Sequence, residues 1–139
     1  MRLNGKSVVV TGASSGMGKA IVERFAKEGA NIIAVARRKE RLEALAESLK
    51  DEPGRVIPYA GDISSEETNN GAIDAAVKHF GRLDILVNNA GIMDDMSPIG
   101  DVKNETIDRV FSVNLHGPIY AMRKAVQVFL EQGGRRQYH

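Results

Sequence analysis

The chain has 139 residues with 19 Lys plus Arg, 18 Asp plus Glu and no Cys, and its formal net charge is +1 at pH 7. This length predicts one domain with one core, and the balanced charge argues against a nucleic-acid partner. The absence of cysteine excludes disulfides, thiolate metal sites and thiol nucleophiles, and it suits a reducing, cytoplasmic location. Any redox chemistry therefore needs a bound cofactor.

The first half of the chain alternates short apolar runs with amphipathic segments. A strand is expected over residues 7–10, and it is too short for a signal peptide or a membrane span. The spacing then predicts a helix over 17–28 that buries Ala20, Ile21 and Phe25. A second strand over 32–35 and a second amphipathic helix around residues 42–49 follow.

The second half repeats this alternation. Strands are expected over 56–59 and 83–87, and the helix between them begins at a capping box formed by Ser64 and Glu67 and ends at Gly81. The last helical region covers 105–132, with an interruption near Gly117 and Pro118. An apolar stripe on this region favours a homo-oligomer and consists of Met122, Ala125, Val126 and Phe129. The alternative is that the stripe only packs on the sheet of its own chain.

Alternation of this kind predicts an α/β fold with a parallel sheet covered by helices. Right-handed crossovers give a doubly wound, Rossmann-type sheet with the strand order 3-2-1-4, in a single domain over residues 1–139 with an irregular tail at 133–139. We expect this sheet to be truncated after the helix that follows strand 4, which leaves that strand as an apolar edge.

A glycine-rich segment joins the first strand to the first helix, where doubly wound folds bind a dinucleotide pyrophosphate. Gly12 allows a tight turn, Gly16 allows close approach of the backbone, and Gly18 allows the helix to pack on the strand. The alternative is that these glycines only mark a turn.

The end of the second strand indicates which dinucleotide is preferred. Ala36 stands where an NAD enzyme would have an acidic residue, and Arg37 and Arg38 follow it. A guanidinium can hold a ribose 2′-phosphate, so we expect NADP(H) to be preferred over NAD(H). The alternative is that both arginines only solubilise the start of a helix.

Three motifs resemble the short-chain dehydrogenase/reductase family over about residues 4–134. They are Thr11-Gly12-x-x-x-Gly16-x-Gly18, Asn88-Asn89-Ala90-Gly91 and the segment 113–117 around Asn114. The resemblance implies cofactor contacts from Gly12, Ser14, Ser15, Gly16, Met17, Gly18, Asp62, Ile63, Asn89, Ala90 and Gly91.

Two residues have specific roles in this resemblance. Asp62 would accept a hydrogen bond from the adenine amino group, although it could instead cap its own turn. Asn114 would be the catalytic Asn that holds a relay water, and Pro118, which lacks an N–H, would free its carbonyl. The alternative is that Pro118 only kinks the helix.

The family's reaction also needs a Ser and a Tyr-x-x-x-Lys pair well after the Asn, and Tyr138 is followed only by His139. We therefore expect the chain to lack that acid–base pair and to be inactive by itself.

The resemblance implies hydride transfer between nicotinamide and a small carbonyl or alcohol substrate. The alternatives are a catalytically silent NADP(H)-binding or regulatory module and a nonfunctional fragment. No metal is expected, because the three histidines are widely separated.

Overall fold

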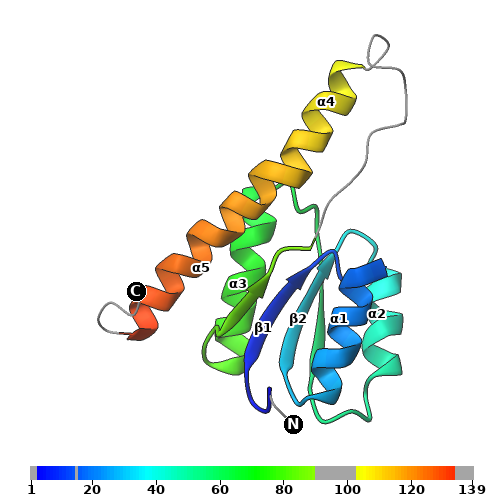
Figure 1. Cartoon of the computed structure of the whole chain (residues 1–139), viewed down its shortest axis with the longest axis vertical. Coiled ribbons are helices and arrows are strands. Elements are labelled where there is room, and N and C mark those ends of the chain that lie inside the picture. The colour runs from blue at the N-terminus through cyan, green and yellow to red at the C-terminus, as the bar shows by residue number, and fades with distance from the viewer. Residues whose placement is uncertain (1–2, 15, 90–102, 134–139) are drawn as a thin grey trace.

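The computed structural model describes residues 3–14, 16–89 and 103–133. Its four parallel strands are β1 (Ser7–Thr11), β2 (Asn31–Ala36), β3 (Val56–Ala60) and β4 (Ile85–Val87), in the order β3-β2-β1-β4 (Figure 1). The predicted order is confirmed. β4 starts two residues later than predicted, because the Asp84 carboxylate accepts the Ser7 N–H at 2.9 Å in place of a backbone carbonyl.

Two pairs of helices cover the two faces of the sheet. Helices α1 (Gly16–Lys27) and α2 (Lys39–Ser48) share one core with the Val8, Val10 and Ile32 side of the sheet. Helices α3 (Glu66–Phe80) and α5 (Gly117–Gly133) share the other core with the Val9 and Ile33 side (Figure 1). The doubly wound arrangement follows from this alternation of buried faces along each strand.

The buried face of α1 differs from the predicted one. Gly18, Val22 and Ala26 are buried, whereas Ala20 is exposed and Phe25 is only partly buried. A Cβ on Gly18 would lie 1.8 Å from the Gly12 carbonyl oxygen, so the helix sits on the phosphate-loop backbone at that residue. The face of α1 that carries Gly18 therefore lies against the sheet and loop, and the predicted burial of Ala20 is wrong.

The start of α3 also differs by one residue. Ser65, and not Ser64, is the N-cap, and its hydroxyl accepts the Thr68 N–H at 3.3 Å. Ser64 is unavailable because its backbone N–H and hydroxyl both donate to Asp62 Oδ1, at 3.0 and 2.8 Å. The predicted helix end is confirmed, since Gly81 caps it with φ 84°.

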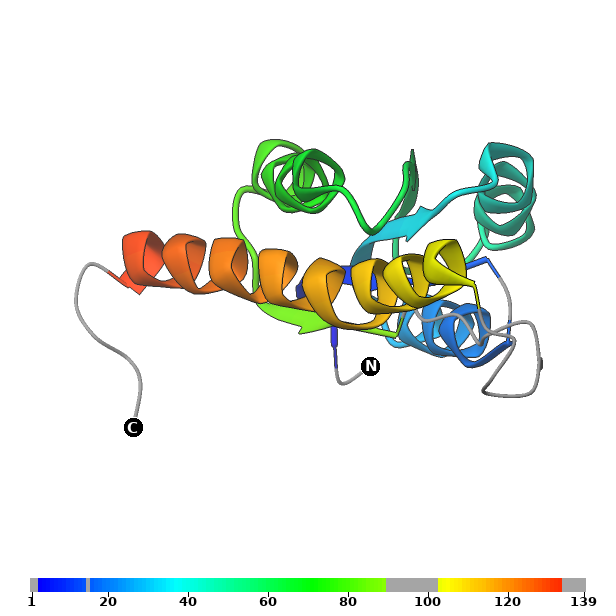
Figure 2. The ribbon, with the colours of Figure 1, turned by 90° about the horizontal axis from the view of Figure 1, so that it is seen from above.

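The last helical region forms one continuous rod, with α4 extending beyond the sheet (Figures 1 and 2). Helix α4 (Asn104–Phe111) runs through a π-helical turn, η2 (Ser112–His116), into α5. The Gly117 N–H donates to the Ser112 carbonyl, five residues back. The predicted interruption near Pro118 is thus a widened turn that keeps the helix direction.

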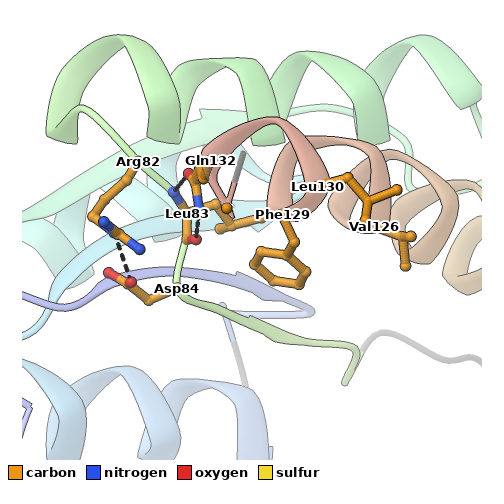
Figure 3. Close-up of a pocket in the computed structure, with 8 residues that line it drawn as sticks. Arg82, Leu83, Asp84, Val126, Phe129, Leu130 and Gln132 are labelled. Atoms are coloured by element: carbon orange, nitrogen blue, oxygen red, sulfur yellow. Dashed lines mark hydrogen bonds and ion pairs between the residues drawn. The ribbon is translucent and has the colours of Figure 1, made fainter. Parts of the chain in front are cut away.

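The two edge strands of the sheet are different. In β3, Pro58 lies opposite Ala34 of β2, but the backbone hydrogen bonds to β2 come from its neighbours, residues 57 and 59. The backbone nitrogen of Pro58, which has no hydrogen to donate, therefore faces away from β2. Beside β4, the Gln132 side chain of α5 donates to the Leu83 carbonyl at 2.8 Å and accepts the Leu83 N–H (Figure 3).

Candidate functional site

The phosphate loop lies at the carboxyl ends of the central strands. The Ala13 N–H donates to the Val35 carbonyl at 3.0 Å, which ties the loop to β2. Gly12 and Gly16 have φ values of 64° and 57°, a region that favours glycine. Helix α1 begins at Gly16 with no acidic residue in its first turn, so its free N–H groups and positive dipole end suit a phosphate anion.

Among the predicted loop residues, Ser14 is half-buried and Met17 is 71% exposed. Ser15 lies outside the described residues. Gly18 leaves no room for a side chain, because a Cβ would also lie 2.6 Å from Asn89 Nδ2. The cradle for a pyrophosphate is therefore built from backbone that only glycine permits at these positions.

The end of β4 is fastened to this loop through Asn89. Its backbone N–H donates to Thr11 Oγ1 at 3.0 Å, and its Nδ2 donates to the Gly12 carbonyl at 3.4 Å. Asn88 makes a longer contact of 3.5 Å with the Pro118 carbonyl. Sequence reasoning missed this role of Thr11, although the residue precedes the first glycine. Ala90 and Gly91 lie outside the described residues.

The basic residues predicted to select the cofactor lie at the end of β2. Arg37 and Arg38 are exposed, and the carbonyl of the neighbouring Ala36 accepts the Gly61 N–H at 3.0 Å. This bond places the end of β3, and hence Asp62, beside the arginines. A cavity of about 430 Å³ between α1 and α2 adds two basic side chains, Lys19 and Arg41, that the sequence reasoning did not assign.

Asp62 and Ile63 form a firmly held corner after β3. Arg109 Nη1 of α4 donates to Asp62 Oδ2 at 2.8 Å, and Asn69 Nδ2 donates to the buried Ile63 carbonyl at 2.7 Å. Partial burial opposes ionisation of Asp62, but the hydrogen bonds from Arg109 and Ser64 outweigh it and lower its pKa to about 2. The carboxylate is therefore charged throughout the physiological pH range.

Asn114 lies in the π-helical turn and its side chain is exposed. Asn114 has an interaction partner within the described residues, and its role in holding a relay water stays a prediction. A Cβ on Gly117 would lie 2.3 Å from the Ile63 carbonyl oxygen, so this turn is packed directly against the Asp62 corner.

One Tyr-x-x-x-Lys spacing does occur, at Tyr120 and Lys124 of α5. It begins only six residues after Asn114, so the expectation that the chain lacks the catalytic pair stays a prediction. Lys124 Nζ pairs with Asp74 of α3 at 3.1 Å. The Tyr120 ring has the Arg123 guanidinium 5.6 Å from its centroid. The ion pair with Asp74 directs the Lys124 ammonium to α3.

A larger cavity, of about 530 Å³, lies at the start of β4 and is lined by Leu83, Asp84 and Phe129 among others (Figure 3). It is at the amino end of the strand, whereas the phosphate loop lies at the carboxyl ends.

The parts of the chain that the structure describes contain no cluster of three or more metal-ligating side chains. Within the same residues, no helix has the length and apolar character needed to cross a membrane.

Comparison with known proteins agrees with this geometry. The family model described as short chain dehydrogenase matches residues 6–136. A 3beta-hydroxysteroid dehydrogenase 2 of Eggerthella lenta is 40% identical over 131 residues, which are 94% of this chain and 50% of the relative. A 3-oxoacyl-[acyl-carrier-protein] reductase of Thermotoga maritima is 39% identical over 95% of this chain and 53% of its own length.

Solved structures give the same result. A short chain dehydrogenase from Burkholderia cenocepacia in complex with NADP has a TM-score of 0.86 and 34% identity, over 92% of this chain and 52% of that one. A 3-ketoacyl-(acyl-carrier-protein) reductase from Brucella melitensis complexed with NADH has a TM-score of 0.85 and 39% identity, over 94% and 52%. The chain thus spans about half the length of the relatives it matches. It belongs to the short chain dehydrogenase family.

Proposed function

We propose that this chain is the cofactor-binding part of an oxidoreductase that transfers hydride between NADP(H) and a small carbonyl or alcohol substrate in the cytoplasm. The observation that carries the proposal is the glycine cradle at the start of α1, where Gly18 packs on the Gly12 backbone and the loop is tied to β2. The residues that would contact the cofactor are Gly12, Ser14, Ser15, Gly16, Met17, Gly18, Arg37, Arg38, Asp62, Ile63, Asn89, Ala90 and Gly91.

In the proposed mechanism the bound nicotinamide supplies the hydride, and the residues of this chain bind and orient it. The phosphate loop holds the pyrophosphate on backbone N–H groups. The Asp62 carboxylate would accept a hydrogen bond from the adenine amino group, and Arg37 would donate hydrogen bonds to the ribose 2′-phosphate. Asn114 would hold a relay water, and the acid that protonates the substrate oxygen would be a separate group. The competing proposal, a silent NADP(H)-binding or regulatory module, is favoured by the orientation of Lys124 toward Asp74.

The cofactor preference gives the first testable prediction. NADPH should bind more tightly than NADH by roughly 1 to 3 kcal/mol, because one charge-assisted contact holds the 2′-phosphate. In Arg37→Ala we expect most of this preference to disappear, measured by titration calorimetry with both cofactors. Arg24→Ala serves as the control, since Arg24 pairs with Glu28 on the side of α1. Equal affinities for NADPH and NADH in the unchanged chain would refute the preference.

Self-association through the long helix is the second prediction. Ala125 is buried on the core, whereas Met122, Val126 and Phe129 are exposed together with Leu115 of the π-helical turn. We propose that a second copy of the chain covers this apolar stripe. Val126→Glu should shift the chain toward monomer in sedimentation velocity, while Gln127→Glu, at the next exposed position, should not. A monomer at every concentration of the unchanged chain would argue against the interface.

A further inference from the structure

A polar cluster joins the loop after β3 to α4, although 47 residues separate its members in the sequence. Arg109 Nη1 donates to Asp62 Oδ2 at 2.8 Å and to Ser64 Oγ at 3.3 Å. Asp62 Oδ1 accepts the Ser64 N–H and hydroxyl, at 3.0 and 2.8 Å. Both oxygens of the carboxylate are therefore held, from its own loop on one side and from α4 on the other.

The held carboxylate still has capacity to bind a ligand. An ionised carboxylate offers about four acceptor positions, and the contacts from Arg109 and Ser64 use three of them. The Asp62 side chain is 40% exposed. It can accept a hydrogen bond from a ligand amino group while its bond to Arg109 remains in place.

Folding stability alone does not account for Arg109. Ion pairs as exposed as this one contribute little to stability. In addition, Arg109 Nη2 is buried and has no hydrogen-bond partner among the described residues, which opposes folding. An apolar side chain at this position would leave no buried donor without a partner. The benefit of the guanidinium therefore lies in its hold on the Asp62 carboxylate.

We propose that Arg109 is a positioning residue for the adenine of the cofactor. It fixes the Asp62 carboxylate at the end of β3, beside Arg37, so that the carboxylate meets the adenine amino group without first having to be ordered. The same arginine lies on the continuous helix that carries Asn114, and it thereby joins the adenine end of the site to the catalytic end. This inference rests on the proposed function, in which Asp62 accepts a hydrogen bond from the adenine amino group.

The test compares NADPH with its hypoxanthine analogue, which lacks the 6-amino group, by titration calorimetry. The unchanged chain should bind NADPH about tenfold more tightly than the analogue, as expected for one hydrogen bond to a charged acceptor. In Arg109→Met this ratio should fall to about 2, because Asp62 is no longer held. If Arg109 had a purely structural role, Arg109→Met would lower the affinity for both ligands equally and leave the ratio of the two affinities unchanged.

Arg123→Met is the matched control, because Arg123 lies on the same rod and pairs with Glu66 at 2.8 Å; its ratio should stay near tenfold. Arg109→Lys keeps the positive charge, and its ratio of NADPH affinity to analogue affinity should lie between those of the unchanged chain and Arg109→Met. If Arg109→Met does not fold, the Arg109→Lys ratio tests the proposal instead. An unchanged or increased ratio in the Arg109 variants overturns the proposal while the proposed function stands. Failure of the unchanged chain to bind either ligand refutes the proposed function itself, and equal binding of both refutes only the role given to Asp62 and Arg109.

Discussion

A polypeptide of these 139 residues should bind NADPH but reduce no carbonyl substrate at a measurable rate. Binding places the hydride donor, but the developing alkoxide also needs a proton, and general acid catalysis of such a step is worth about 10²- to 10⁴-fold. Asn114 cannot supply that proton because an amide is too weak an acid. NADPH oxidation should therefore match the rate without protein for ketones, aldehydes and acyl-thioester ketones.

Two tyrosine variants make this prediction decisive. Tyr120 has Lys124 four residues later, but that lysine is paired with Asp74, and Tyr138 lies outside the described residues. Turnover that Tyr120→Phe or Tyr138→Phe abolishes would show that one of these phenols is the acid. In that case the silent-module proposal fails, and the chain is an oxidoreductase by itself.

Replacement of Gly18 by alanine should have the largest effect on stability. The added Cβ would lie 1.8 Å from the Gly12 carbonyl oxygen and 2.7 Å from the Gly12 carbonyl carbon, so the backbone of α1 or of the phosphate loop has to move. We expect Gly18→Ala to lower the free energy of unfolding by about 3 kcal/mol and to weaken NADPH binding at least about tenfold. Urea denaturation and calorimetry measure the two effects.

Lys27→Ala is the control for this variant, because Lys27 is exposed at the end of the same helix and should change stability by less than about 0.5 kcal/mol. An unfolding midpoint of Gly18→Ala equal to that of the unchanged chain would mean that the close packing of α1 on Gly12 is absent in solution.

The order of strands and helices could be predicted from the sequence because it depends on local signals. Each strand is a short apolar run, and Gly81 ends α3 where a left-handed residue is required. The choice between Ser64 and Ser65 as N-cap could not be predicted from spacing alone. It depends on Asp62, whose carboxylate takes both donors of Ser64 and leaves Ser65 to cap the helix.

For the candidate site, the sequence predicted the glycine cradle but not the contacts that hold it. Thr11 and Asn89 are 78 residues apart, and no periodicity relates them. Arg109 lies on an amphipathic helix where an arginine is ordinarily solvated, and only the folded chain shows that it reaches Asp62. The presence of Pro118 indicated a disturbed helix, yet a kink and a widened turn have the same sequence signal.

The contrast between the two sheet edges predicts how a polypeptide of these 139 residues aggregates. The outer edge of β3 lacks a donor at Pro58 and templates an added strand poorly. Beside β4, the Gln132 amide occupies the backbone groups of Leu83, and among the described residues this is the one side chain recorded on that edge. Strand addition is therefore favoured on one side of the sheet alone. Two molecules joined through that side present only proline-blocked edges to a third, so edge pairing stops at a closed pair and does not elongate into fibrils.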